Sequence, residues 1–203
     1  MTKAAMPPGE VVFPGSRLHH VESRHTGREY DLYVNLPDVK DGSRYPVIYI
    51  LDAQWGFKDM VSAWAALRND RQVPDCIIVG VAYSGESPEY SKLRMMDLTP
   101  TAVDSEPGSG GAERLLNFLE SEAIPFIEAE YPTDPSKRIL NGNSLGGLFA
   151  LYAAMERPSL FHSYIAGTAA FSWDDHTILR HHDRLSEATS SWPTHLHLFV
   201  GES

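Results

Sequence analysis

The segment from residue 138 to residue 155 constrains the fold of this chain more than any other feature. It reads as a short apolar strand, then Gly142-Asn143-Ser144-Leu145-Gly146, then an apolar helix with a stop at Pro158. A G-x-S-x-G sequence between a strand and a helix is typical of a nucleophile elbow, a strained turn that lifts one serine hydroxyl above a sheet. The segment therefore predicts an α/β fold with Ser144 displayed at the end of a strand.

The two glycines of the motif fall where a tight turn needs small residues. Gly142 is expected to let the chain bend sharply, and Gly146 to let the helix approach the neighbouring strand. The alternative interpretation is a glycine-rich turn whose serine only caps a helix.

The remaining sequence alternates between strand and helix patterns. Apolar or alternating runs predict strands at 30–35, 47–51, 76–79, 138–141, 163–167 and 195–200, and helical spacing predicts helices at 60–67 and 113–127. This order indicates a mostly parallel central sheet with helices on both faces. Ser144 and the loops at 52–57 and 83–88 are expected to meet at one rim, with 99–111 as a mobile loop over the site.

Composition limits the partners and the setting. With 203 residues and 42% hydrophobic content, we expect a single domain over 1–203, in which 1–27 form an amino-terminal extension and edge strand. The net charge of −10 argues against nucleic-acid or anionic-membrane partners. No membrane span or apolar leader is evident, which predicts a cytoplasmic location, and the lone Cys76 predicts a small core residue and excludes an intrachain disulfide.

Five ordered segments of this chain resemble the esterase family of the α/β-hydrolase superfamily, which includes siderophore and feruloyl esterases, S-formylglutathione hydrolase and mycolyltransferases. The resemblance runs from about Tyr30 to the last residue. It rests on the segments 45–52, 94–100, 110–119, the elbow, and 158–167.

The resemblance implies an α/β-hydrolase fold and a catalytic role for Ser144 as nucleophile. It also implies an oxyanion hole formed by the backbone N–H groups of Leu145 and Gln54. The family commonly has Asp-Gly after the preceding strand, whereas this chain has Asp52-Ala53. No cofactor is required for this chemistry.

The acid and the base of a serine triad are harder to assign. Hydrolases of this fold order the triad as serine, acid, histidine, which leaves Glu202 as the acidic candidate after the strand at 195–200. The family's base lies further on, after one more strand, so the expectation is a carboxy-terminally truncated chain without the last strand and histidine loop. Histidines at 176, 181 and 182 are expected to be solvated, and the pair at 195 and 197 lacks a third metal ligand.

Arg94 and Asp97 belong to one of the family segments. Arg94 is expected either to bind a polar group of the substrate or to form an ion pair that pins a long loop, and the second interpretation is favoured. Trp55, together with Phe57, Tyr83 and Trp173, is a candidate for lining an acyl or aryl pocket, although each is equally typical of core.

The sequence thus predicts a serine carboxylic-ester hydrolase that acts on a small-molecule ester through an acyl-enzyme. Two alternatives stay open: an acyltransferase that uses the same acyl-enzyme, and a non-catalytic binding domain if the general base is truly absent. Neither the particular ester nor the oligomeric state follows from the sequence.

Overall fold

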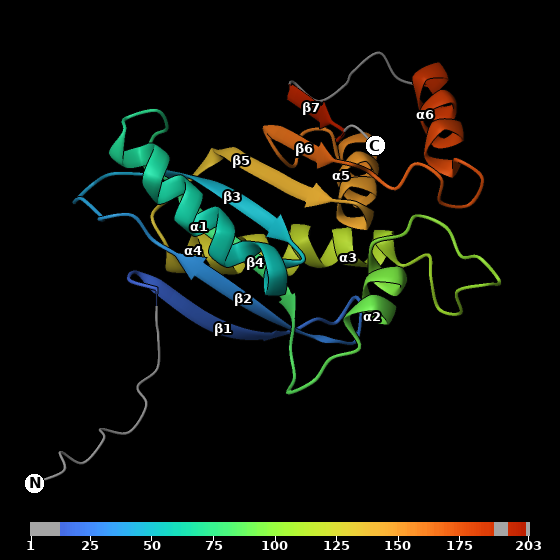
Figure 1. The fold of residues 1–203 in the computed structure, drawn as a ribbon, viewed down its shortest axis with the longest axis horizontal. Helices are drawn as coiled ribbons and strands as arrows, with labels where there is room; N and C mark the ends of the chain where they lie inside the picture. Colours follow the sequence, from blue (N-terminus) through green and yellow to red (C-terminus); the bar gives the residue numbers. More distant parts are fainter. Residues whose placement is uncertain (1–12, 189–194, 202–203) are drawn as a thin grey trace, which may run out of the picture.

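A seven-stranded sheet forms the centre of the molecule (Figure 1). The computed structural model describes residues 13–188 and 195–201. In chain order the strands are β1 (Ser16–Glu22), β2 (Glu29–Asn35), β3 (Tyr45–Leu51), β4 (Ile77–Tyr83), β5 (Thr133–Asn143), β6 (Ser163–Gly167) and β7 (His195–Phe199). Their spatial order is β1-β2-β4-β3-β5-β6-β7.

The direction of the strands places the site. β2 pairs antiparallel with β1 on one side and with β4 on the other. The strands β4, β3, β5, β6 and β7 run parallel to one another. The carboxyl ends of these five parallel strands therefore share one rim, where ligands bind in open sheets. β1 is an edge strand, as expected for part of the segment 1–27.

Helices cover both faces of the sheet (Figure 1). The helical elements are α1 (Ala53–Asn69), α2 (Tyr90–Asp97), α3 (Ala112–Phe118), a π-helical turn (Leu119–Ala123), α4 (Ile124–Glu130), α5 (Leu145–Glu156) and α6 (Thr177–Ala188). One apolar cluster lies between α1 and the sheet, and a larger cluster lies between the sheet and α3, α4 and α5. The first cluster includes Ile48, Ile50 and Phe57, and the second includes Tyr49, Leu140 and Phe149.

These observations confirm the predicted α/β class and the predicted strands. Two helices differ in extent from the sequence pattern. α1 begins at Ala53, well before the predicted start at residue 60, because the chain turns into the helix directly after β3. The single helix predicted over 113–127 is instead α3, a π-helical turn and α4. Pro125 lies in the first turn of α4, where its missing N–H is tolerated.

Hydrogen bonds hold the loop at 99–111, for which mobility was expected. The Gly110 N–H donates to Thr99 Oγ1 at 2.7 Å, and the Gly111 N–H donates to the Met96 carbonyl at 2.8 Å. The Val103 N–H donates to Ser109 Oγ at 3.0 Å. Among the described residues, no helix is both long enough and apolar enough to cross a membrane.

Candidate functional site

Ser144 occupies the turn between β5 and α5. Its φ of 57° and ψ of −117° are a strained conformation for a residue with a side chain, and its side chain is exposed. The backbone around it is fixed by three hydrogen bonds. The Ser144 N–H donates to the Gly167 carbonyl at 2.9 Å, and the Ser144 carbonyl accepts from Leu148 at 2.9 Å and from Ala170 at 3.0 Å. The geometry is that of the predicted elbow.

The two glycines of the motif both serve close packing. A Cβ at Gly142 would lie 2.1 Å from the carbonyl oxygen of Gly146, so the strand and the helix touch at this point. A Cβ at Gly146 would lie 3.2 Å from Asp52 Oδ2. The turn therefore requires glycine at position 142 for lack of space, while the positive φ belongs to Ser144 itself.

Two helices begin at this end of the sheet with backbone N–H groups that have no backbone acceptor among the described residues. The first N–H groups of a helix have no partner within it and carry a partial positive charge. Leu145 is the first residue of α5, and Gln54 is the second residue of α1, and within the described chain neither N–H has a backbone acceptor. Both residues thus stand at the helix positions that an oxyanion hole uses.

The expected loop at 52–57 is a helical turn. Asp52 adopts the left-handed conformation, with φ 56° and ψ 40°, and α1 begins at the next residue. The Asp52 carbonyl accepts hydrogen bonds from Trp55 at 3.0 Å and from Gly56 at 3.3 Å. Gln54 is consequently held on a helix, although it does not line the cavity described next. Its side-chain amide is buried without a hydrogen-bond partner among the described residues.

A cavity of about 620 Å³ opens beside Ser144, between the start of α1 and the ends of β3 and β5. Its lining includes the candidates Ser144, Trp55 and Arg94, and the full set comprises Ile50, Leu51, Asp52, Trp55, Gly56, Asp59, Met60, Ala63, Arg94, Asn141, Asn143 and Ser144. The structure therefore brings three of the sequence-predicted site residues into one space. The volume is typical of pockets for small molecules.

Arg94 is anchored in this cavity by Asp52. Arg94 Nε donates to Asp52 Oδ1 at 2.6 Å and Nη2 donates to Oδ2 at 2.9 Å, with side chains 17% and 13% exposed. The guanidinium also lies 5.3 Å from the centre of the Trp55 ring. Of its five N–H bonds, two are used, and the other three have no hydrogen-bond acceptor within the described part of the chain. Sequence reasoning missed this pairing, because the partners are 42 residues apart.

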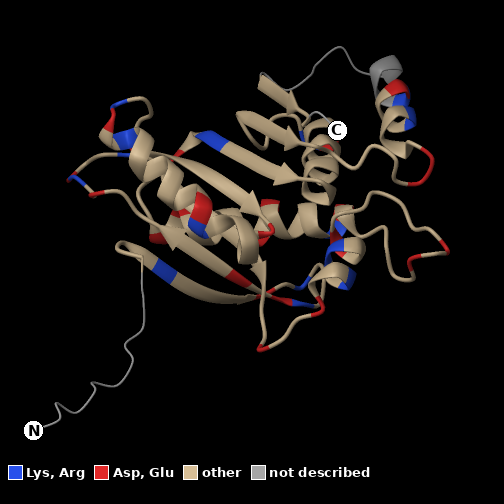
Figure 2. Cartoon of the chain, in the orientation of Figure 1, with Lys and Arg blue, Asp and Glu red and all other residues tan. Residues whose placement is uncertain are grey.

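An ion pair was the favoured interpretation for Arg94, and the structure shows one, but Arg94 and Asp97 do not pair with each other. Asp97 binds Arg28, at 2.6 Å between Oδ1 and Nη1, and Arg94 binds Asp52. Arg94 is thus ion-paired, and it also lines the cavity of Ser144. In Figure 2, α2 carries basic residues at the side of the molecule toward which the parallel strands point.

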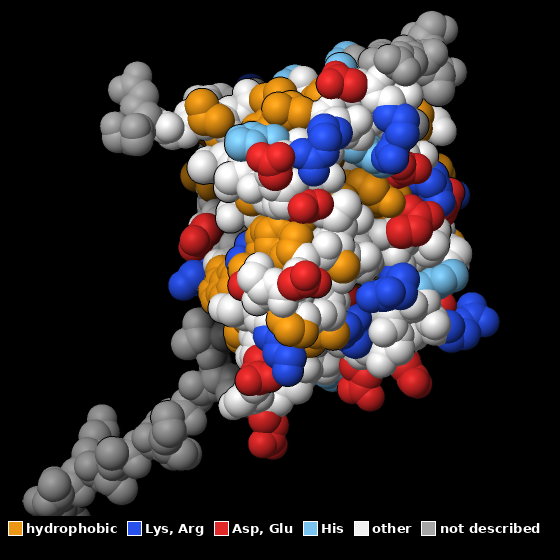
Figure 3. Space-filling view, turned by 90° about the vertical axis from the view of Figure 1, so that its right-hand side faces the viewer, with side chains coloured by type: hydrophobic (Ala, Val, Ile, Leu, Met, Phe, Trp, Pro, Cys, Tyr) orange, Lys and Arg blue, Asp and Glu red, His pale blue; other side chains and the backbone are white. Residues whose placement is uncertain are grey.

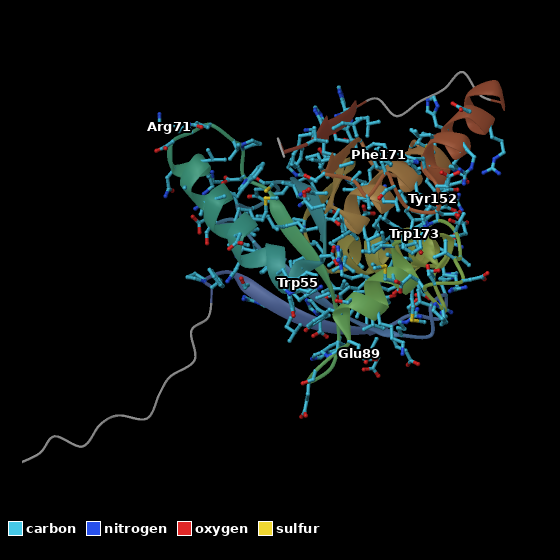
Figure 4. The ribbon with its side chains drawn as sticks, turned by 45° about the vertical axis from the view of Figure 1, so that its right-hand side comes forward. Trp55, Arg71, Glu89, Tyr152, Phe171 and Trp173 are labelled. Atoms are coloured by element: carbon cyan, nitrogen blue, oxygen red, sulfur yellow. The ribbon has the colours of Figure 1, made fainter. Side chains whose placement is uncertain are left out.

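Aromatic side chains differ in their exposure at this end of the molecule. Trp55 is 49% exposed, whereas Phe57 and Tyr83 are buried core residues. Trp173 donates from Nε1 to the carbonyl of Thr101 at 3.2 Å and so joins the segment after β6 to the loop at 99–111. Figure 4 shows Trp55 at the start of α1 and Trp173 on the segment after β6. Trp55 is accordingly the aromatic candidate that the cavity presents.

None of the described histidines is in the lining of the cavity of Ser144. His181, on α6, packs against Tyr152 at 5.4 Å between ring centres, and burial lowers the pKa of His181. His162, His195 and His197 form a row on β7 and just before β6. Within the described ranges no group of three or more His, Cys, Asp or Glu residues is arranged to hold a metal ion.

The acidic candidate Glu202 lies outside the described residues. The end of the molecule that carries the rim is shown in Figure 3, where acidic, basic and hydrophobic side chains are interspersed. The surface seen there has no extended patch of one charge.

Comparison with known proteins identifies the family. The family described as "Putative esterase" matches residues 23–198. The chain belongs to this esterase family. Ferri-bacillibactin esterase BesA of Bacillus subtilis is 31% identical over 208 residues, which cover 93% of this chain and 71% of the relative. Siderophore triacetylfusarinine C esterase of Aspergillus fumigatus is 32% identical over 180 residues, covering 85% and 61%.

Solved structures agree with the assignment to this esterase family. The BES protein from Bacillus cereus superposes with a TM-score of 0.86 at 28% identity, over 98% of this chain and 79% of that chain. Siderophore hydrolase EstB from Aspergillus nidulans gives 0.82 at 28% identity, over 96% and 72%. The chain is thus an esterase-family hydrolase with an α/β fold, and it spans about three fifths to four fifths of these four relatives.

Proposed function

We propose that this chain hydrolyses a carboxylic ester through an acyl-enzyme on Ser144. The observation that carries the proposal is the strained backbone of Ser144, which exposes its side chain beside a cavity of about 620 Å³. In this mechanism Ser144 Oγ attacks the ester carbonyl carbon and loses its proton to a base, and the alcohol leaves as it takes up a proton. Water then attacks the acyl-enzyme and releases the acid.

The developing negative charge on the carbonyl oxygen needs donors that are already in place. We assign the backbone N–H groups of Leu145 and Gln54 to this role, because each lies in the first turn of a helix and has no backbone acceptor within the described chain. Helix dipoles favour negative charge at the same positions. The side-chain amide of Gln54 is buried and has no hydrogen-bond partner among the described residues, so we assign this role to its backbone N–H alone.

Arg94 adds a full positive charge to the same cavity. Asp52 holds two of its N–H groups and leaves the other three available to a ligand. A guanidinium in a partly buried site stabilises an oxyanion or an anionic substrate group more strongly than it would in water. Arg94 therefore serves the proposed reaction in addition to the structural role expected from the sequence.

The proposed general base is a histidine, and none of the described histidines lines the cavity; Glu202 is the proposed acid. A serine hydroxyl without a base is a poor nucleophile, and loss of the base in a serine triad lowers kcat by about 10⁶. Turnover therefore depends on a histidine that reaches Ser144 in the active protein.

A siderophore ester is the proposed substrate class. Two observations support it: the relatives named above are a ferri-bacillibactin esterase and a triacetylfusarinine C esterase, and the cavity presents the cation of Arg94 beside the half-exposed ring of Trp55. Cationic and planar aromatic groups together suit ligands that carry negative charge and flat conjugated groups.

Labelling with a fluorophosphonate tests the proposal directly. In the protein expressed from its complete reading frame, we expect covalent modification at Ser144 and none in Ser144→Ala, and we expect ester hydrolysis to fall by about 10³-fold or more in the same variant. The matched control is Ser172→Ala, at an exposed serine outside the cavity lining. Equal labelling of the parent and Ser144→Ala would contradict the proposal.

Product analysis separates hydrolysis from the alternatives. If a competing alcohol takes the acyl group in preference to water, the enzyme is an acyltransferase with the same acyl-enzyme. If Ser144 is not labelled at all, the chain is better described as a binding domain that keeps the elbow.

A further inference from the structure

Asp97 is a fully buried carboxylate that the proposed chemistry does not use. It is the last residue of α2, and both of its oxygens are bound from the start of β2. Arg28 Nη1 donates to Oδ1 at 2.6 Å, and the Tyr30 hydroxyl donates to Oδ2 at 2.7 Å. Tyr30 is itself 1% exposed and stacks on Phe118, with 4.5 Å between ring centres. Asp97 is therefore held by the buried Tyr30 hydroxyl and by the part-buried Arg28 guanidinium.

These contacts fix a helix that could not hold its place alone. α2 has eight residues, fewer than an isolated helix needs to be stable in water. Its remaining ties to the core include the Tyr83 hydroxyl, which donates to the Leu93 carbonyl at 3.2 Å, and the Gly111 N–H, which donates to the Met96 carbonyl at 2.8 Å. Two side chains of α2 form ion pairs at the edge of the sheet: Asp97 with Arg28 just before β2, and Arg94 with Asp52 just after β3.

Arg94 precedes Asp97 by three residues on the same helix. Side chains at this spacing are neighbours on a helix surface, so Arg94 and Asp97 form a potential ion pair with each other. Arg28 and Tyr30 occupy both oxygens of Asp97, and Arg94 pairs with Asp52 instead. The carboxylate of Asp97 is thereby removed from competition for the guanidinium that lines the cavity.

The pKa shifts near Asp97 and Asp52 reflect the burial of this region and the charges within it. Burial raises the pKa of Asp97, while Tyr30, Arg28 and Arg114 favour its charged form. Burial and the charges of Asp97 and Asp52 also raise the pKa of Tyr83, which lies near both.

We infer that Asp97, held by Arg28 and Tyr30, is a positioning residue that sets Arg94 into the cavity of Ser144. The inference rests on the proposed function, because its effect is read through the reactivity of Ser144. Asp97 itself does not touch the substrate in this scheme. It determines the position of α2 and leaves Asp52 as the partner of Arg94.

A double-mutant cycle distinguishes positioning from general stability. The second-order rate constant for fluorophosphonate labelling of Ser144 is measured for the parent, Asp97→Asn, Arg94→Gln and the double variant. Each protein is expressed from its complete reading frame. We expect about a tenfold loss in the parent and less than about a twofold loss when Arg94 is already replaced, because two substitutions that act through the same guanidinium are not additive. If Asp97→Asn does not fold, Tyr30→Phe removes one of the two hydrogen bonds to Asp97 and completes the same cycle.

Glu128→Gln is the matched control. Glu128 accepts a hydrogen bond from Arg138 at 2.6 Å, and this part-buried pair joins α4 to β5 outside the cavity lining. We expect the control to leave labelling within about twofold of the parent. Equal losses from Asp97→Asn in both backgrounds, or no loss in the parent, would overturn the inference and leave Ser144 chemistry intact. Absence of labelling in the parent would instead overturn the proposed function, and the inference with it.

Discussion

Replacing Gly142 by alanine tests whether the elbow depends on direct contact between β5 and α5. The new Cβ would lie 2.1 Å from the Gly146 carbonyl oxygen and 2.3 Å from the Gly146 carbonyl carbon. These distances are more than 1 Å shorter than the optimal separation of about 3.5 Å between non-bonded atoms. The obstructing atoms are backbone, so the strand and the helix must move apart, and we expect a loss of more than about 3 kcal/mol in the free energy of unfolding.

Gly146→Ala is the matched comparison, because it adds the same methyl group four residues away. Its Cβ would lie 3.2 Å from Asp52 Oδ2 and 3.5 Å from Leu51 Cβ, so a shift of a few tenths of an ångström relieves it. Alanine is also the better helix former by about 0.5–1 kcal/mol. We therefore expect a stability within about 1 kcal/mol of the parent and slower labelling of Ser144, since the methyl group presses on the carboxylate that anchors Arg94.

Denaturant unfolding followed by tryptophan fluorescence measures the first effect, and fluorophosphonate labelling measures the second. A typical domain has only 5–15 kcal/mol of stability, so Gly142→Ala is expected to shift the unfolding midpoint strongly or to prevent folding. If Gly142→Ala unfolds within about 1 kcal/mol of the parent and labels at the parent's rate, the contact is not a requirement and the packing argument fails.

Three further predictions concern the guanidinium of Arg94, the thiol of Cys76 and the ring of Trp55. Arg94→Lys is expected to lower kcat/KM for ester hydrolysis about 10- to 100-fold, because an ammonium cannot bind Asp52 through two parallel hydrogen bonds and still present donors to the cavity; steady-state rates near those of the parent would contradict this. Burial raises the pKa of Cys76 to about 12. The thiol of the folded chain therefore should not react with a disulfide reagent at pH 8, and it should react once per chain in urea. The free energy of unfolding should also fall as the pH rises from about 9 through 12, because the thiol loses its proton in the unfolded chain first. Trp55→Leu is expected to raise KM for a siderophore ester about fivefold while changing KM for a small acetate ester by less than twofold, since only the larger substrate reaches an exposed aromatic side chain; equal changes for both esters would argue that Trp55 acts through Arg94 alone.

The sequence was sufficient to predict the fold because its signals are local. Buried parallel strands are short apolar runs, and the elbow is a continuous pentapeptide between a strand and a helix. The antiparallel strand at 29–35 follows from simple alternation. Each of these patterns is decided by residues a few positions apart, and the structure confirms them.

The charged part of the candidate site could not be predicted in the same way. Arg94 pairs with Asp52 across 42 residues, and Asp97 pairs with Arg28 across 69 residues. At such separations in the sequence, each arginine could pair with several acidic residues. The position of α2 against the sheet decides which pairs form. The available signal was the spacing of Arg94 and Asp97 in one segment, which pointed to an ion pair without identifying its partners.

Strain at Ser144 and charge at Arg94 are supported by different parts of the molecule. A residue held at an unfavourable φ and ψ costs about 1–3 kcal/mol, and it persists when its surroundings over-determine the backbone. At Ser144 this is done by β5, by β6 through the Gly167 carbonyl, and by the first turn of α5. Arg94 instead depends on α2, which lies outside the sheet. Substitutions at the elbow should therefore lower stability and Ser144 reactivity together, whereas mild substitutions in α2 should lower reactivity first, because a short helix moves before the sheet unfolds.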